Sequence, residues 1–311
     1  MLRRALVAFV LLLCACTSDG PEVVAPRRSN TPSDSIPFET PTPRPTGPNA
    51  SRNPVAPAVA ELIRSPKEIA EALISLRRAL LSDVESWVAD GAHPDTRLGR
   101  RVNIQALGEQ TLMRRLITDP KLAEEVTRRL PQRVRRRVQS HLVVGRRLRA
   151  LIDPVSPPIE LRTTEPLPPE ELLAVFKRAG RRHGIDWEIL AAVNFVESRF
   201  GRAIGSSSAG AIGPMQFLPT TWDIYGRGDI RDPHDAIPAA ARLLDASGAP
   251  EDVRSALFAY NNSDVYVDAI MAYARDMKLD MRNYYIYWSW EVFVLTTKGD
   301  VQLTGPGGRR P

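Results

Sequence analysis

Apolar residues recur at helical spacing along most of the chain after residue 60. Ile69, Leu73, Leu76 and Leu80 follow one another at intervals of four, three and four residues, which places them on one stripe of a helix. Just before them, residues 65–68 read Ser-Pro-Lys-Glu, a capping box with proline at the first helical position. Asp119-Pro120 has a similar form, and helical spacing of apolar residues continues from there to Leu148. The pattern predicts a helical bundle over residues 59–153.

A second helical region follows a proline-rich break at residues 153–169. Glu170 and Glu171 favour a helix start, and Gly184 is placed to end that helix. Asp186 is placed to cap the next helix, residues 187–199, which is apolar on nearly every side apart from Asn194. Such a helix belongs in a core.

Aromatic and β-branched residues dominate the chain after Asn283, and Lys298-Gly299-Asp300 then forms a turn signal. This predicts a β-hairpin over residues 283–304. Its aromatic side chains either stack on sugar rings or hold the hairpin against the helices. The fold class is therefore mainly α, with a small C-terminal hairpin and a short tail at residues 305–311.

The first 58 residues have the composition of an export signal and a tether. Arg3 and Arg4 precede a short apolar run, and the sequence Leu13-Cys14-Ala15-Cys16 is similar to a bacterial lipobox with Cys16 as the lipidated residue. An ordinary signal peptide is the alternative. Residues 17–58 contain ten prolines and almost no large apolar residues, which predicts a disordered tether. We expect an extracytoplasmic, lipid-anchored protein that faces the cell wall.

Charge and cysteine content narrow the possibilities further. Both cysteines lie within the first 16 residues, which excludes a disulfide scaffold from the folded part. The basic excess lies in the bundle, where residues 61–152 carry 19 Lys and Arg against 11 Asp and Glu. Its arginine run is either the solvated face of a helix or a contact surface for anionic lipid or anionic wall polymers. Nucleic acid is not an expected partner, because export removes the protein from the cytoplasm. The arginines concerned are Arg133, Arg135, Arg136, Arg137, Arg146, Arg147 and Arg149.

Glu197 is the candidate for acid/base chemistry. It lies at the C-terminal end of the apolar helix, where apolar surroundings and the negative end of the helix dipole both raise a carboxyl pKa. A carboxyl that holds its proton near neutral pH can serve as a general acid in glycosidic cleavage.

A loop of small residues follows, from Gly205 to Pro219, and leads into another helix. Such a loop allows backbone to approach a ligand closely. Gln216 supplies a neutral amide that can bind a sugar or a neighbouring carboxyl. Farther on, Tyr260 ends a helix and can point its hydroxyl into the same cleft.

Four sequence blocks in order resemble the lytic transglycosylases of the goose-type lysozyme superfamily. They are Glu-Ser-Arg-Phe at 197–200, the block at 210–222 with Gly-Pro-Met-Gln-Phe-Leu-Pro, Asp-Pro-His-Asp-Ala-Ile at 232–237, and Ala-Tyr-Asn-Asn-Ser at 259–263. The second block looks most like the branch of membrane-bound lytic transglycosylase B and its actinobacterial relatives. The resemblance implies a lysozyme-like catalytic domain of the SLT type at residues 163–282.

The resemblance also implies site residues and a reaction. Glu197 would be the single catalytic acid/base, while Met215, Gln216, Tyr260 and Asn261 would bind substrate. The last three of these would either line the saccharide groove or orient Glu197. The substrate would be peptidoglycan, cleaved at the β-1,4 bond from N-acetylmuramic acid to N-acetylglucosamine with 1,6-anhydro ring closure. The substrate's own acetamido group would replace a second carboxylate, and no cofactor is required.

Alternatives are a hydrolytic muramidase and a non-catalytic wall-binding module. A second carboxylate facing Glu197 would favour hydrolysis, and Asp223, Asp229, Asp232 and Asp235 are the candidates for it. Cap and turn chemistry explains these residues better, and their spacing is not that of a calcium loop. The four histidines have no ligand spacing and are expected at the surface or at caps, so we predict no metal site.

Overall fold

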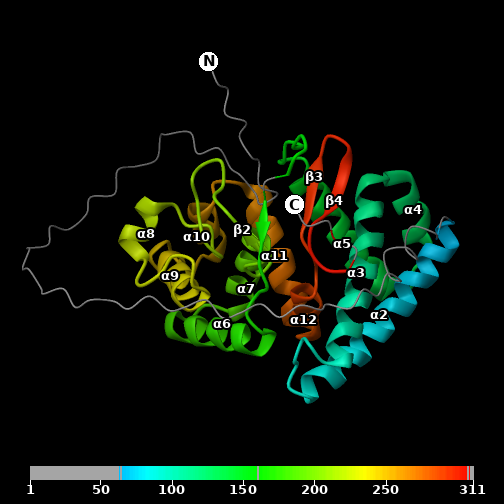
Figure 1. Cartoon of the computed structure of the whole chain (residues 1–311), viewed down its shortest axis with the longest axis horizontal. Helices are drawn as coiled ribbons and strands as arrows, with labels where there is room; N and C mark the ends of the chain where they lie inside the picture. The colour runs from blue at the N-terminus through cyan, green and yellow to red at the C-terminus, as the bar shows by residue number, and fades with distance from the viewer. Residues whose placement is uncertain (1–62, 64, 160, 307, 309–311) are drawn as a thin grey trace, which may run out of the picture.

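The computed structural model describes residues 63, 65–159, 161–306 and 308 and is mainly α-helical (Figure 1). Two small antiparallel sheets accompany the helices. The predicted signal sequence, the lipidation site at Cys16, the tether and most of the predicted tail lie outside the described residues. Within the described part of the chain, no helix combines the length and the apolarity needed to cross a membrane.

Four helices make up the N-terminal region, as predicted. They are α2 (Pro66–Ala89), α3 (Arg97–Thr118), α4 (Pro120–Arg129) and α5 (Gln132–Arg149). The capping box is formed: the Ser65 hydroxyl accepts from the Glu68 backbone N–H, and the Glu68 carboxylate accepts from the Ser65 N–H, both at 3.2 Å. The Asp119 carboxylate caps α4 by accepting from the Leu122 N–H at 3.0 Å.

The second helical region surrounds α7. Its elements are β1 (Arg162–Thr163), α6 (Pro169–His183), α7 (Trp187–Ser198), β2 (Ala203–Ile204), α8 (Pro219–Tyr225), α9 (Pro233–Ala246), α10 (Val253–Tyr260) and α11 (Asp264–Leu279). Helix α6 ends at Gly184 in the left-handed conformation, as its sequence predicts. Helix α7 packs against α6, α9 and α11, which explains why it is apolar on nearly every side.

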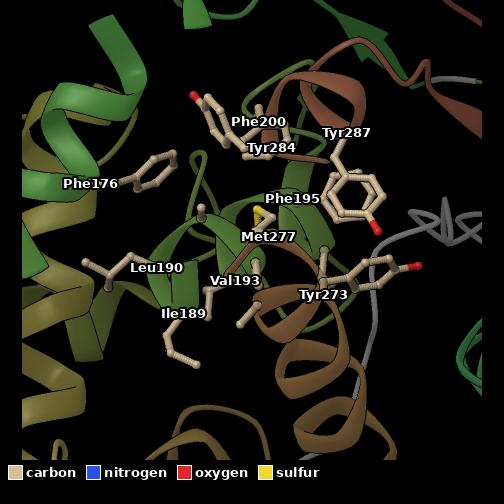
Figure 2. Close-up of a cluster of buried hydrophobic side chains, with 14 of the residues drawn as sticks. Phe176, Ile189, Leu190, Val193, Phe195, Phe200, Tyr273, Met277, Tyr284 and Tyr287 are labelled. Carbon is tan, nitrogen blue, oxygen red and sulfur yellow. The ribbon is translucent and has the colours of Figure 1, made fainter. Parts of the chain in front are cut away.

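One hydrophobic core continues from the N-terminal helices into the second region. Trp87 of α2 is fully buried and lies 6.1 Å from the ring of Tyr285 and 6.0 Å from that of Trp288. Around α7 and α11, Phe176, Phe195 and Tyr284 belong to the same core (Figure 2). In Figure 1 the N-terminal helices stand on one side, α6 to α10 on the other, and α11 and α12 (Arg282–Trp288) between them. The domain boundary near residue 160 stays a prediction, and the packing across it is extensive.

The C-terminal segment departs from the predicted hairpin. Residues 282–288 form helix α12 (Arg282–Trp288), and only β3 (Phe293–Thr296) and β4 (Gly299–Gln302) pair as a hairpin, with Val294 opposite Val301. Residues 284–288 are all buried, so aromatic enrichment here reflects a short helix buried on all sides rather than a strand. These aromatic side chains pack between the helices and hold them together. Stacking on sugar rings, the alternative, does not fit because the side chains are buried.

Neither expectation for the arginine run describes it fully, because most of these side chains bind within the protein. Arg137 donates to Glu109 at 2.9 Å and to Asp276 at 3.2 Å. The others make these bonds: Arg135 to the Arg128 and Leu130 carbonyls, Arg146 to the Leu116 and Ile117 carbonyls, Arg147 to Asp268, and Arg149 to Asp300. Arg133 and Arg136 are exposed. The run therefore docks α5 onto α3, α4, α11 and the hairpin.

His141 also differs from the expectation of a surface or cap residue. It is buried, and its Nε2 lies 2.7 Å from the Tyr287 hydroxyl and 3.4 Å from Asp276. Burial and the neighbouring Arg137 lower its pKa, so the ring is neutral at physiological pH.

Candidate active site

Glu197 lies one residue before the end of α7, among buried residues. Its side chain is buried, and residues 189–196 before it are buried as well. Asp186 precedes the helix but makes no side-chain cap; its carboxylate instead accepts from Lys278 at 2.5 Å. Burial in the core therefore fixes this helix more than its cap does.

The chain turns sharply after Glu197, and this turn fixes where the helix ends. Arg199 and Phe200 both have positive φ, at 53° and 59°, which is uncommon for residues with a side chain. The Ser198 hydroxyl holds the turn by accepting from the Gly201 N–H at 2.8 Å. Two successive strained residues beside a buried carboxyl are typical of functional sites.

Burial raises the pKa of Glu197 to about 8. The Tyr266 hydroxyl acts in the opposite direction; it approaches the carboxyl without the geometry of a full hydrogen bond and favours the ionised form. No other carboxylate among the described residues acts on this pKa. Glu197 therefore carries a proton at neutral pH, as the sequence predicts for a general acid.

The loop between β2 and α8 faces this end of α7. Ile212 and Phe217 exchange backbone hydrogen bonds at 2.9 and 3.0 Å, which closes a tight hairpin turn. Gly213 has φ of +81°, and a Cβ there would lie 2.0 Å from the Ile230 carbonyl oxygen. Only glycine fits this position.

Side chains from two helices anchor the loop. Asn194 Nδ2 and the Ser198 hydroxyl of α7 both donate to the Pro214 carbonyl, at 2.7 and 2.6 Å. The Tyr260 hydroxyl at the end of α10 donates to the Met215 carbonyl at 2.6 Å. The same helix that carries Glu197 thus holds the loop in place.

The structure brings Tyr260 together with Glu197, and the loop residues lie beside them. Tyr260 and Glu197 interact electrostatically, and the Tyr260 ring is nearly parallel to that of Tyr266, with centroids 6.4 Å apart. Gln216 turns its amide N–H towards the Gly213 carbonyl, at 2.9 Å, rather than bonding to Glu197.

Two of the residues predicted to bind substrate have a side-chain oxygen that accepts no hydrogen bond from the described residues. Gln216 Oε1 and Asn261 Oδ1 are buried and lack hydrogen-bond partners among the described residues. Buried polar atoms are almost always paired, so these two unpaired acceptors are unusual. Met215 differs from its expected role, because its side chain is fully buried and it contributes its carbonyl to Tyr260 instead.

The four aspartates of the alternative mechanism are not gathered around Glu197. Asp232 caps α9 by accepting from the His234 N–H at 2.8 Å, and Asp235 accepts from the Asp229 N–H at 2.8 Å. Asp229 accepts from the Arg231 N–H, and Asp223 is exposed on α8. These are cap and turn roles, as the sequence indicates. Within the described residues, no group of three or more His, Cys, Asp or Glu side chains is arranged to hold a metal ion.

Tyr266 is the site residue that the sequence did not point to. Ser263 caps α11 by accepting from the Tyr266 N–H at 3.3 Å, which places Tyr266 in the first turn of a helix packed on α7. The position of Tyr266 just after the Asn-Asn-Ser block was the one sequence signal for a role in the site. That signal was weak, because its partner Glu197 lies 69 positions earlier in the chain.

Comparison with known families gives an independent view of this region. Comparisons with curated proteins and with solved structures find no match. Residues 174–280 match the family model of the transglycosylase SLT domain, and this segment contains Glu197, the anchored loop, Tyr260 and Tyr266. The members of that family are lytic transglycosylases that act on peptidoglycan. The match covers about a third of the chain and supports the placement of residues 174–280 in the lytic transglycosylase superfamily.

Proposed function

We propose that this protein cleaves the β-1,4 bond between N-acetylmuramic acid and N-acetylglucosamine in peptidoglycan and leaves 1,6-anhydro ends, in the course of cell-wall remodelling. The observation that carries the proposal is the buried carboxyl of Glu197, whose pKa of about 8 keeps it protonated at neutral pH. It lies beside a fixed loop in which Gln216 Oε1 has no hydrogen-bond partner among the described residues.

Glu197 acts first as an acid in this scheme. Its proton passes to the glycosidic oxygen as the bond to C1 of the muramic acid breaks, so that the leaving sugar departs as a neutral alcohol. The carbonyl oxygen of the substrate's 2-acetamido group supports the positive charge that develops at C1. The absence of a second carboxylate acting on Glu197, among the described residues, agrees with this substrate-assisted chemistry.

Glu197 then acts as a base. Its carboxylate takes the proton of the C6 hydroxyl while the C6 oxygen bonds to C1, which closes the anhydro ring and restores the acid. Ring closure requires that water be kept from C1. The burial of Glu197 favours this outcome, and hydrolysis by a lysozyme-like route is the alternative.

Digestion of purified peptidoglycan followed by mass analysis of the products tests the proposal. We expect anhydro-muropeptides, each one water lighter than the corresponding reducing product. Reducing ends alone would identify a hydrolytic muramidase, and an absence of soluble products would identify a wall-binding module. Either result would contradict the proposed reaction.

We also propose that Cys16 carries a lipid that anchors the protein to the outer face of the cell membrane. The support is the sequence around Cys16, with small Ala15 before it and Leu13 three residues earlier. Cys16→Ser should release the mature protein from membrane fractions, whereas Cys14→Ser should leave it bound. Soluble wild-type protein would refute the anchor.

A further inference from the structure

A cavity lies near the end of α7, between the N-terminal helices and the hairpin β3–β4. Its volume is about 100 Å³, and its walls come from α3, α5, α7, α11 and the hairpin, which are neighbours in Figure 1. Val196 and Arg199 line it, but Glu197 does not. The cavity is therefore separate from the candidate active site, although Arg199 follows Glu197 by only two residues.

The charged groups in the cavity wall do not balance. Three arginines, Arg114, Arg149 and Arg199, face one aspartate, Asp300. Asp300 forms ion pairs with both Arg114 and Arg149, the latter at 2.7 Å. With His141 neutral, three positive charges against one negative charge leave an excess of two.

Arg199 is the cation of this wall that has no counterion among the described residues. Its guanidinium lies 4.3 Å from the centre of the Phe195 ring, and its single hydrogen bond to a described residue runs from Nη1 to the Phe195 carbonyl at 2.9 Å. Burial and the neighbouring Arg114 lower its pKa to about 10, so it remains charged at neutral pH.

Helix capping explains only part of this arrangement. The bond to the Phe195 carbonyl places positive charge at the C-terminal end of α7, which is favourable. However, a guanidinium has five N–H donors, and this bond uses one of them. Arg199 is half-buried, and none of its nitrogens is among the buried atoms that lack a partner within the described residues, so its remaining donors are accessible from the cavity that it lines. Planar oxyanions are the partners that satisfy a guanidinium best.

We propose that this cavity binds a small carboxylate, with Arg199 as its principal ligand. A water molecule requires about 10–15 Å³ of such space, so the cavity has room for several waters or for one carboxylate with its nearest atoms. The carboxylate can come from a free small acid or from a peptide chain of the wall polymer. The second source rests on the proposed function, and the first does not.

Titration calorimetry with acetate and with the dipeptide alanyl-glutamate tests the proposal and separates the sources. Each titration uses the mature chain at constant ionic strength, with chloride as the reference anion. We expect saturable binding of at least one probe; binding of both indicates a free acid, and binding of the dipeptide alone indicates a peptide source. Repeating the titrations with Glu197→Gln keeps the result independent of cleavage, so failure here and failure of the proposed function are distinguishable.

Variants locate the site. Arg199→Gln should weaken binding at least about tenfold, because it removes a charge-assisted bond. Arg133→Gln is the matched control, since Arg133 is exposed on α5 and lies away from the cavity wall. Arg149→Gln changes the cavity wall at a half-buried side chain and should also weaken binding, which keeps the test decisive if Arg199→Gln does not fold. Binding of neither probe by the wild type would show that the cavity holds only water. That result, or unchanged binding in the folded cavity variants, would overturn the proposal.

Discussion

Glu197 is a buried carboxyl that holds its proton at neutral pH, and it lies beside a loop that side chains of its own helix hold in place. Burial raises its pKa to about 8, and the Tyr266 hydroxyl keeps that pKa from rising further. The two stacked tyrosines near it have different tasks. Tyr260 bonds to the loop through the Met215 carbonyl, whereas Tyr266 acts on the carboxyl itself.

The first prediction uses these two tyrosines as a matched pair. Because the reaction needs protonated Glu197, kcat/KM should fall on the alkaline side with an apparent pKa near 8. Tyr266→Phe removes the group that favours ionisation and should move this alkaline limb to higher pH. Tyr260→Phe should lower the rate by loosening the loop but leave the limb in place. A pH–rate profile of all three proteins checks this prediction. The same apparent pKa for the alkaline fall in kcat/KM of the wild type and of Tyr266→Phe would contradict it.

The second prediction concerns stability and pH. Between about pH 4.5 and 8 the unfolded chain releases the Glu197 proton while the folded protein keeps it, so raising the pH destabilises the wild type. Glu197→Gln lacks this penalty. As the pH rises across this range, the free energy of unfolding of Glu197→Gln should therefore increase relative to that of the wild type by up to about 1.4 kcal/mol per pH unit. Urea denaturation at several pH values measures the difference, and a difference independent of pH would count against a protonated, buried Glu197.

At the scale of elements, the loop at residues 205–218 depends on the backbone freedom of glycine. Gly213 and Gly210 both have positive φ, at +81° and +84°, but only Gly213 has a backbone carbonyl where a Cβ would lie. This difference gives the third prediction. Gly210→Ala should cost about 1 kcal/mol for its left-handed conformation, while Gly213→Ala should cost more and should reduce activity as the loop shifts. Unfolding curves and turnover assays test both variants, and equal effects would show that the close approach to Ile230 is unimportant.

Local chemistry made much of the fold predictable from the sequence. The Ser65 and Asp119 caps and the end of α6 at Gly184 rest on hydrogen bonds or backbone conformations within a few residues, so their signals are local. Helix α12 could not be predicted in the same way. Its aromatic residues favour a strand by propensity, and only tertiary packing on all sides makes them a helix.

The candidate site was predictable in part for the same reason. Glu197 and the loop at residues 205–218 each lie in a continuous stretch of sequence with a recognisable pattern. Tyr266, in contrast, comes close to Glu197 only through the packing of α11 on α7. The arginine run forms a surface only in part, with Arg133, Arg136 and Arg147 exposed, because several of its other members have partners that are distant in sequence. Arg137, for example, bonds to Asp276, 139 positions away. Periodicity can mark such a residue as polar, but it cannot reveal a buried partner.

At the scale of the whole molecule, a buried ionic cluster joins the N-terminal helices to the second helical region. Arg137 of α5 binds Glu109 of α3 and Asp276 of α11, and the Tyr287 hydroxyl of α12 donates to the same aspartate. Arg137 holds the pKa of Glu109 below its usual value, against the effect of burial. The cluster and the shared aromatic core indicate that both regions fold together.

The fourth prediction tests this connection. Arg137→Leu leaves Glu109 charged and buried without its main partner, which typically costs about 3–5 kcal/mol. Arg136→Leu is the control, because Arg136 is exposed on the same helix. Calorimetry should show one unfolding transition in both proteins, at a clearly lower temperature for Arg137→Leu. Two separate transitions in the wild type would contradict a shared core.

The central claim is that Glu197 donates and recovers the proton in glycan cleavage. Its most direct test is the turnover of purified peptidoglycan by Glu197→Gln, with a sedimentation assay to confirm that the variant still binds the polymer. Gln keeps the shape and a hydrogen-bonding amide but cannot transfer a proton, so turnover should fall by at least ~10²-fold while binding is retained. Turnover above about a tenth of the wild-type value, well short of the loss expected for a general acid, would contradict the account.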